Sequence, residues 1–344
     1  MAAAINDSAW LEWVTGLMGG VSRQTHAAAF PPDKFYCLLD ELPLHLIPRP
    51  TRTRFENDEL HSDLVLNPDC TLCVGAEVPT ELASRRDLLS GLAIEGTIAW
   101  VRDSGRGWLP FWLGPELEQI VRKLTPDAPI ETSVRPIARR LLAAANIIVP
   151  RPNSSRNARA GQNANAASQF QEKGYALVPG LLHPFHVAAL RRYYRQRIRS
   201  GAISLGDRQS SRRYTAHNEP VARFFHHQIT STFSEVAGHE LRPSYVYMAS
   251  YLSGAELKKH TDREQCEFSI TLCLDFSPEP TLATPWPIHL KTPKGVVAVY
   301  QVLGDGLAYR GTRLAHYRSV LPEGQTSTSI FFHYVGRDFR GSLD

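Results

Sequence analysis

The chain has 344 residues, of which 43% are hydrophobic and 21% are charged, and its formal net charge is +4. These values are typical of a globular chain with one large or two modest domains. No apolar run approaches the ~20 residues needed to cross a bilayer, the first residues lack the regions of a signal peptide, and five cysteines do not make a disulfide framework. We therefore expect a cytoplasmic protein without a membrane partner.

Local groups of basic residues and one CxxC motif offer little chemistry. The basic groups are the pairs Arg139-Arg140, Arg191-Arg192 and Arg212-Arg213. Such pairs are more typical of a solvated face than of a nucleic-acid site, so we expect no nucleic-acid partner. Cys70 and Cys73 are not followed by a second pair at zinc-site spacing, which favours ordinary thiols over a metal site.

The first 150 residues are predicted to mix helices and strands. Apolar residues recur at helical spacing from Trp10 to Met18 and stop at Gly19-Gly20. A hairpin is predicted over 97–112, because β-forming runs flank a turn signal at Asp103 to Gly107. The other elements predicted here are strands at 64–66 and 71–74 and helices at 115–124 and 134–145.

A polar segment separates two predicted domains. Residues 151–167 have no periodic apolar positions, which indicates an exposed linker between an accessory or substrate-recognition domain, 1–150, and a second domain, 168–344. In the second domain a helix is predicted from His183 to Ser200, and from Pro243 short strands alternate with turns. That spacing predicts an antiparallel sandwich or barrel.

Two histidines and one aspartate in the strand-rich part have the spacing of a metal site. His260 and Asp262 lie two residues apart, so in an extended chain both side chains point to the same face. His316 follows on a different predicted strand. Two imidazoles and one carboxylate leave coordination positions open, which is the arrangement of non-haem Fe(II) oxygenases. A satisfied surface or core histidine is the alternative.

These residues and their flanks resemble the Fe(II)/2-oxoglutarate-dependent dioxygenases of the prolyl-hydroxylase-like branch, over about residues 170–335. The matching motifs are Phe170…Gly174-Tyr175…Gly180, Tyr251…His260-Thr261-Asp262 and Gly304-Asp305-Gly306…His316. The resemblance implies an α+β fold in which a double-stranded β-helix, or jelly roll, follows a helical lead-in. It also implies that the enzyme requires Fe(II) as its metal and uses 2-oxoglutarate and O₂ as cosubstrates. The implied reaction oxidises an unactivated C–H bond and yields succinate and CO₂.

The chain departs from the family pattern at the 2-oxoglutarate anchor. Relatives carry an arginine or lysine on the final strand, whereas the segment Gln325 to Ser329 has no cation. Arg318 is the predicted substitute, because period 2 turns it to the same interior as His316, where a guanidinium can grip a carboxylate bidentately. Tyr251 falls where related enzymes hydrogen-bond 2-oxoglutarate, although a core aromatic is the alternative. Further candidates, held in reserve, are Ser327 and Ser329 for a hydroxyl and Arg263 and Arg310 for a cation.

Alternation along two strands predicts what faces the interior. Tyr245, Tyr247 and Tyr251 share one strand face, and a small polar face formed by Ser269, Thr271 and Cys273 suits a barrel interior with room for a cosubstrate. The segment Pro285-Trp286-Pro287 is predicted to lie at the barrel rim without a chemical role.

Three functions from different classes are open at this point. An oxygenase acting on a peptide, a natural-product-like molecule or a small metabolite is preferred, and the carboxylate of Asp262 favours hydroxylation over halogenation, because radical halogenases lose that ligand. The alternatives are a non-catalytic binding protein on the same barrel and a cupin-like metal enzyme that does not use 2-oxoglutarate. The segment 92–149 also resembles winged-helix modules that bind leader peptides, which would imply a peptide substrate. A structural extension that supports the barrel is the other interpretation.

Overall fold

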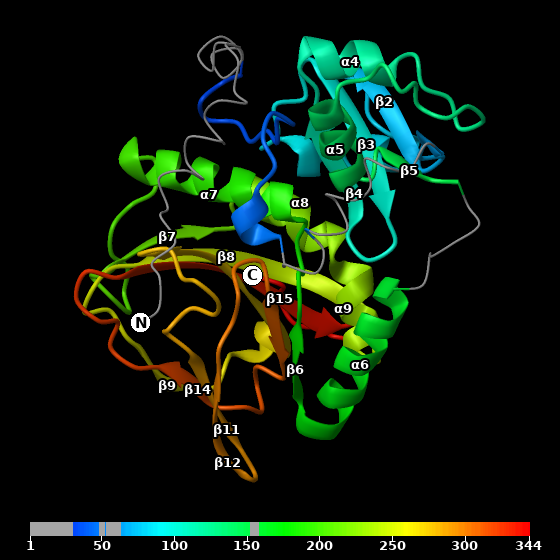
Figure 1. The fold of residues 1–344 in the computed structure, drawn as a ribbon. Coiled ribbons are helices and arrows are strands. Elements are labelled where there is room, and N and C mark those ends of the chain that lie inside the picture. Colours follow the sequence, from blue (N-terminus) through cyan, green and yellow to red (C-terminus); the bar gives the residue numbers. More distant parts are fainter. Residues whose placement is uncertain (1–29, 48–51, 53–62, 152–157) are drawn as a thin grey trace, which may run out of the picture. The chain divides into compact units, whose positions relative to one another are not determined.

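The computed structural model describes residues 30–47, 52, 63–151 and 158–344 (Figure 1). The predicted helix from Trp10 to Met18 lies outside the described residues. Residues from Pro32 onward form one compact unit. Within the described part of the chain, no helix has the length and apolar character required to span a membrane.

Two antiparallel sheets form the second half of the chain. The major sheet has the order β6 (Tyr175–Val178), β13 (Gly306–Tyr309), β10 (Phe268–Ser277), β15 (Thr326–Gly336), β8 (Leu241–Tyr251) and β7 (Arg213–His217). The minor sheet has the order β12 (Gly295–Val299), β11 (Ile288–Thr292), β14 (His316–Arg318) and β9 (Leu257–His260). From β8 to β15 the chain alternates between the sheets, except at the β11–β12 hairpin. This connectivity is that of a double-stranded β-helix, so the predicted jelly-roll core is confirmed.

Helices cover the outer face of the major sheet and leave its inner face to the site. They are α6 (Ala158–Lys173), α7 (Pro184–Arg199), α8 (Pro220–Gln228) and α9 (Thr230–Ala237), and they confirm the helical lead-in (Figure 1). Strand β10 is buried on both faces along almost its whole length. Its polar residues Ser269 and Thr271 bond to other interior groups, as the alternation predicts.

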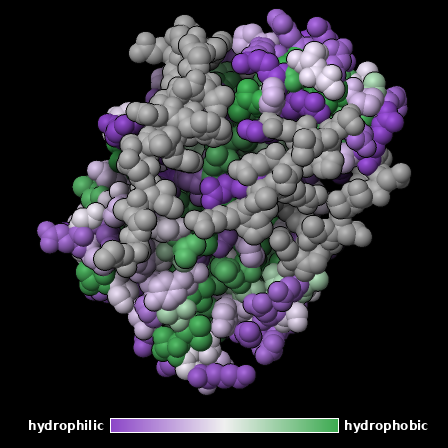
Figure 2. All heavy atoms as spheres, in the orientation of Figure 1, coloured by the Kyte–Doolittle hydropathy of each residue, from purple (hydrophilic) through white to green (hydrophobic). Residues whose placement is uncertain are grey.

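The opposite sheet ends in an exposed strand. Because β12 is the last strand in the order, one of its edges has no neighbouring strand. Figure 2 shows hydrophobic surface toward the lower end of this face, in the region of the β11–β12 hairpin, and Val296 of β12 is 56% exposed. The predicted ligands His260 and His316 lie on β9 and β14, at the other side of the minor sheet.

The first half of the described chain forms a smaller group of strands and helices. The predicted hairpin is confirmed as β3 (Thr97–Asp103) and β4 (Gly107–Trp112), with β2 (Cys70–Val74) on the outer side of β3. Its turn closes at Gly107, whose φ of +67° favours glycine. The remaining elements of this part are β1 (Leu64–Leu66) paired with β5 (Ile148–Pro150), α3 (Thr80–Ala83), α4 (Pro115–Val121), α5 (Pro136–Ala144) and the 3₁₀ turns η2 (Leu44–Leu46) and η4 (Arg86–Leu89). A further 3₁₀ turn, η5 (Glu264–Cys266), lies in the second half of the chain, between β9 and β10.

Buried hydrogen bonds join this first part to the rest of the unit. The Arg106 side chain donates to the backbone oxygens of Leu181, at 3.2 Å, and Gly180, at 2.5 Å. The His186 ring, buried in α7, donates from Nε2 to the Pro110 oxygen of β4 at 2.9 Å. The division into domains at 1–150 and 168–344 stays a prediction.

Two local predictions are wrong. The second half of the predicted linker belongs to helix α6, in which Ala166 and Phe170, four residues apart, are buried. The arginine pairs do not all lie on solvated faces, because one member of each pair is buried, namely Arg139, Arg191 and Arg213. Arg191 is neutralised by Asp275, which is the usual condition for burying a charge.

Candidate metal centre

Two strands of the minor sheet bring the three predicted ligands together. His260 ends β9 and His316 begins β14, and the register of these strands pairs the two residues directly. Asp262 follows in the loop after β9, where its backbone N–H donates to the Gly311 oxygen at 3.0 Å. The cluster therefore depends on the pairing of strands that are far apart in sequence.

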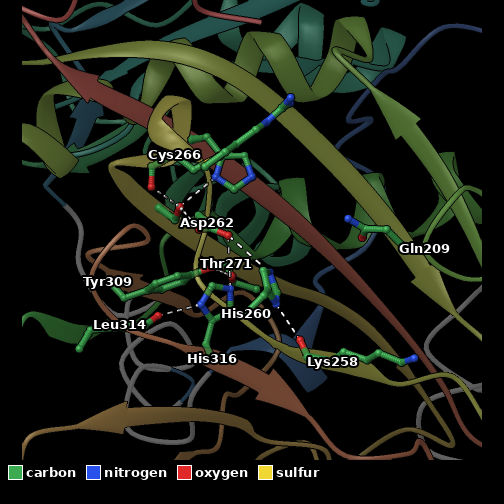
Figure 3. Close-up of polar contacts among 12 residues, drawn as sticks. Gln209, Lys258, His260, Asp262, Cys266, Thr271, Tyr309, Leu314 and His316 are labelled. Atoms are coloured by element: carbon green, nitrogen blue, oxygen red, sulfur yellow. Dashed lines mark hydrogen bonds and ion pairs between the residues drawn. The ribbon is translucent and has the colours of Figure 1, made fainter.

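The three side chains converge on one point (Figure 3). The Oδ1 atom of Asp262 lies 3.5 Å from Nε2 of His260 and 3.5 Å from Nε2 of His316. The two imidazole centroids are 4.4 Å apart. One ligand atom from each residue lies within 4.8 Å of the others, which is the requirement for binding one ion.

Backbone contacts set the orientation of both imidazoles. Nδ1 of His260 donates to the Lys258 oxygen at 2.7 Å, and Nδ1 of His316 donates to the Leu314 oxygen at 3.0 Å. When Nδ1 carries the proton, the neutral ring presents the lone pair of Nε2 to the cluster, as metal-binding histidines do.

The charges in the cluster shift its pKa values in opposite directions. The hydrogen bond with Asp262 raises the pKa of the partly exposed His260, whereas burial lowers the pKa of His316. Burial works to raise the pKa of Asp262, but the hydrogen bond from His260 and the charge of His316 hold it below its ordinary value. The carboxylate is thus kept ionised, which is the form that binds a cation.

Arg318 lies at the other end of the same short strand and points into the barrel. It is 3% exposed, Nη1 donates to the Trp286 oxygen at 2.5 Å, and the guanidinium lies 4.5 Å from the centroid of the Trp286 ring. Its Nε has no hydrogen-bond partner, and neither does Oγ of the buried Ser329 on β15. Among the residues that the structure describes, no carboxylate forms an ion pair with Arg318.

Tyr251 lies between two guanidiniums. It is buried, and the charges of Arg213 and Arg318 both act on it, opposing the rise in the pKa of its hydroxyl that burial causes. The Arg213 side chain donates to the Tyr251 oxygen at 3.5 Å and is paired with Asp207, at 2.9 Å from Nε. Arg318 is therefore the guanidinium near Tyr251 that keeps an uncompensated charge.

The other candidates from the sequence lie elsewhere. Arg263 stacks over Tyr245, 4.7 Å from its ring centroid, and Arg310 stacks over the rings of Phe170 and Phe268 at 5.4 Å. Sequence reasoning missed Trp286, which was assigned to the rim, and Arg213, which was assigned to a solvated face. The sequence around Trp286 does not indicate its contact with Arg318, because the two residues are 32 positions apart and the contact forms only when the chain folds.

No family model matches the chain, and no curated protein matches it. Solved structures similar to it include the α-ketoglutarate-dependent epimerase SnoN of nogalamycin biosynthesis, at 13% identity and a TM-score of 0.43, covering 52% of this chain and 83% of that chain. A prolyl-4-hydroxylase of Pseudomonas putida is 18% identical, with a TM-score of 0.43, covering 51% of this chain and 100% of that chain. HygX of Streptomyces hygroscopicus, with nickel, 2-oxoglutarate and hygromycin B bound, is 14% identical, with a TM-score of 0.41, covering 51% of this chain and 88% of that chain.

All three TM-scores are below 0.5, so the fold assignment rests on the strand order described above, and the function rests on the geometry of the site.

Proposed function

We propose that the chain is an Fe(II)/2-oxoglutarate-dependent dioxygenase, with the metal held by His260, Asp262 and His316. The observation that carries the proposal is the convergence of both Nε2 atoms on Asp262 Oδ1 in the same barrel as Arg318, whose buried Nε has no hydrogen-bond partner. A ferrous ion bound there would supply the activation of O₂, coupled to decarboxylation of 2-oxoglutarate, that oxidises a C–H bond.

Polar groups in the barrel interior support binding of the cosubstrate as well as of the metal. A dianion in a barrel with little water requires a charge partner, because a buried unpaired charge is costly. Arg318 Nε and Ser329 Oγ are buried donors without partners in the protein, and carboxylate oxygens are the kind of acceptor that such donors require. The Trp286 ring supports the guanidinium from one side, and Tyr251 adds a hydroxyl nearby. Arg318 and Tyr251 are the residues that we propose bind 2-oxoglutarate.

We extend the proposal to hydroxylation of a peptide or natural-product-like small molecule by a cytoplasmic enzyme. The carboxylate ligand Asp262 supports hydroxylation over halogenation. For the smaller N-terminal part we propose a role in substrate recognition, which its place in the same compact unit as the barrel supports.

Anaerobic titration with Fe(II) and 2-oxoglutarate tests the proposal. We expect a metal-to-ligand charge-transfer absorption band in the wild type and none in Asp262→Ala, followed by formation of succinate when O₂ is admitted. A band without succinate under O₂ would indicate the non-catalytic binding protein. Metal binding that 2-oxoglutarate does not perturb would indicate a cupin-like enzyme, and failure to bind any divalent metal would contradict both metal-dependent enzymes.

A further inference from the structure

The two oxygens of Asp262 have different surroundings. Oδ1 faces both imidazoles, whereas Oδ2 accepts a hydrogen bond from the Ser269 hydroxyl at 3.0 Å. Gly311 packs against the same oxygen, since a Cβ atom added there would lie 2.3 Å from Oδ2. The protein thus binds one carboxylate oxygen itself and leaves the other toward the ligand cluster.

The Ser269 hydroxyl is fixed by a second residue. Ser269 on β10 and His333 on β15 are direct cross-strand partners, so their side chains share the interior face. Ser269 Oγ lies 2.9 Å from Nδ1 of His333, and both residues are buried. Because an ionised carboxylate can only accept, the serine hydrogen points to Asp262, and the serine oxygen then accepts the Nδ1 hydrogen of His333.

His333 is itself held firmly. Its backbone oxygen accepts a hydrogen bond from Nε2 of His226 at 2.9 Å, and its ring lies 4.7 Å from the Tyr245 ring, centroid to centroid. His333, Asp262 and the buried Cys266 also have ligand-type atoms within 4.8 Å of one another. In that second group, however, Cys266 Sγ bonds to the Tyr245 hydroxyl at 3.0 Å and His333 Nδ1 bonds to Ser269. This group is therefore a hydrogen-bonded support behind Asp262.

We propose that Ser269 and His333 are positioning residues that hold Asp262 Oδ2 away from the metal, so that the aspartate donates Oδ1 alone. The inference rests on the proposed function. If Asp262 donates only one oxygen, more coordination positions of the metal remain for the cosubstrate and O₂. A facial triad with a one-oxygen carboxylate leaves three positions of an octahedral ion open, and a chelating carboxylate would take one of them.

Binding of Co(II) under anaerobic conditions tests the inference without turnover. Ser269→Ala should weaken Co(II) binding by about 10–100-fold, the usual effect of losing a partner behind a metal ligand. It should also change the energies and intensities of the visible Co(II) d–d bands, because a freed carboxylate that chelates would replace another ligand in the coordination shell. Ser250→Ala is the matched control, since Ser250 is a buried serine bonded to Thr328, away from the cluster.

A pair of His333 variants keeps the inference testable if Ser269→Ala does not fold. His333→Asn places an amide N–H near the position of Nδ1 and should restore Co(II) affinity and spectrum toward the wild type, whereas His333→Leu should behave like Ser269→Ala. Wild-type affinity and spectrum in both Ser269→Ala and His333→Leu would overturn the inference and leave the proposed function intact. Absence of Co(II) binding in the wild type would instead overturn the proposed function.

Discussion

The two ends of the barrel interior differ in how their polar atoms are satisfied. At the metal end, the outer nitrogens of both histidines bond to backbone oxygens, and the second oxygen of Asp262 bonds to Ser269. At the anchor end, Arg318 Nε and Ser329 Oγ have no partner. Buried polar atoms in native proteins are nearly always paired. The protein itself therefore orients the side chains at the metal end, and the contrast supports our proposal that a ligand with acceptor oxygens binds at the anchor end.

Removing a ligand at the metal end should have the largest effect. Asp262→Ala leaves two imidazoles, which hold a labile divalent ion poorly, so Fe(II) binding and succinate formation should fall below detection. His239→Ala is the control, because His239 is an exposed histidine outside the barrel interior. Full activity in any two of the alanine variants of His260, Asp262 and His316 would refute the metal assignment.

Arg318→Ala should mainly weaken the anchor end. Losing the charge partner of a buried carboxylate costs about 2–5 kcal/mol, so the KM for 2-oxoglutarate should rise by about 30-fold to several thousand-fold. Fe(II) affinity should change little, because Arg318 is not a ligand, and Arg318→Lys should recover only part of the loss, because an ammonium lacks the bidentate fork.

Arg310→Ala provides the matched control for Arg318→Ala, because Arg310 stacks on Phe170 and Phe268. An unchanged KM for 2-oxoglutarate in Arg318→Ala would contradict the assignment of Arg318 as the anchor, and with it the proposed difference between the two ends. Loss of Fe(II) binding in that variant would show that Arg318 instead supports the strand of His316.

The free energy of unfolding should depend on pH through His186, which lies outside both ends of the barrel interior. Burial lowers the pKa of His186 to about 4, below its ordinary value of 6.5. Between these values the unfolded chain binds the proton and the folded chain does not, so the free energy of unfolding falls as pH drops from 6.5 toward 4 and is unaffected above 6.5. His186→Gln should reduce this slope by on the order of 1 kcal/mol per pH unit. Denaturant unfolding at pH 7.5 and 5 measures it, and equal slopes would contradict the prediction.

Ser329→Ala should weaken the anchor end less than Arg318→Ala does. A hydrogen bond from a hydroxyl to a charged carboxylate contributes about 1.5–3 kcal/mol, so the KM for 2-oxoglutarate should rise by about 10- to 150-fold with an unchanged turnover number. Stability should not decrease, because the hydroxyl has no partner within the protein. A larger destabilisation than loss of affinity would mean that Ser329 is part of the fold and that the anchor end is less open than its contacts indicate.

The parts of this site that could be predicted from the sequence are those fixed by local spacing. His260 and Asp262 share a face because they are two residues apart, and Arg318 shares the face of His316 for the same reason. The interior position of Ser269 was predicted from alternation, but its contact with Asp262 and the roles of His333 and Trp286 were not. These contacts arise from strand pairing and loop packing over long distances in the sequence. The residue types give no sign of such contacts.

Helix α6 shows a different limit. Its alanines and amides lack a strong apolar pattern, yet Ala166 and Phe170 pack inward, and the Gln171 side chain donates to the Ala237 oxygen at 2.6 Å. Tertiary packing stabilised a segment whose composition is typical of a linker.

The jelly roll was predictable in outline because its strands are short and regularly separated by turns. The order of the strands in the two sheets was not.

The pairing of His260 with His316 also makes the metal a reporter of folding. Strands β9 and β14 are distant in sequence, and contacts of this kind form slowly because the intervening chain must first be ordered. A chain that has collapsed without closing the minor sheet has its two histidines apart and no tight site. We therefore expect the capture of a divalent ion during refolding to lag behind the recovery of helical circular dichroism, and to mark the moment at which the barrel closes.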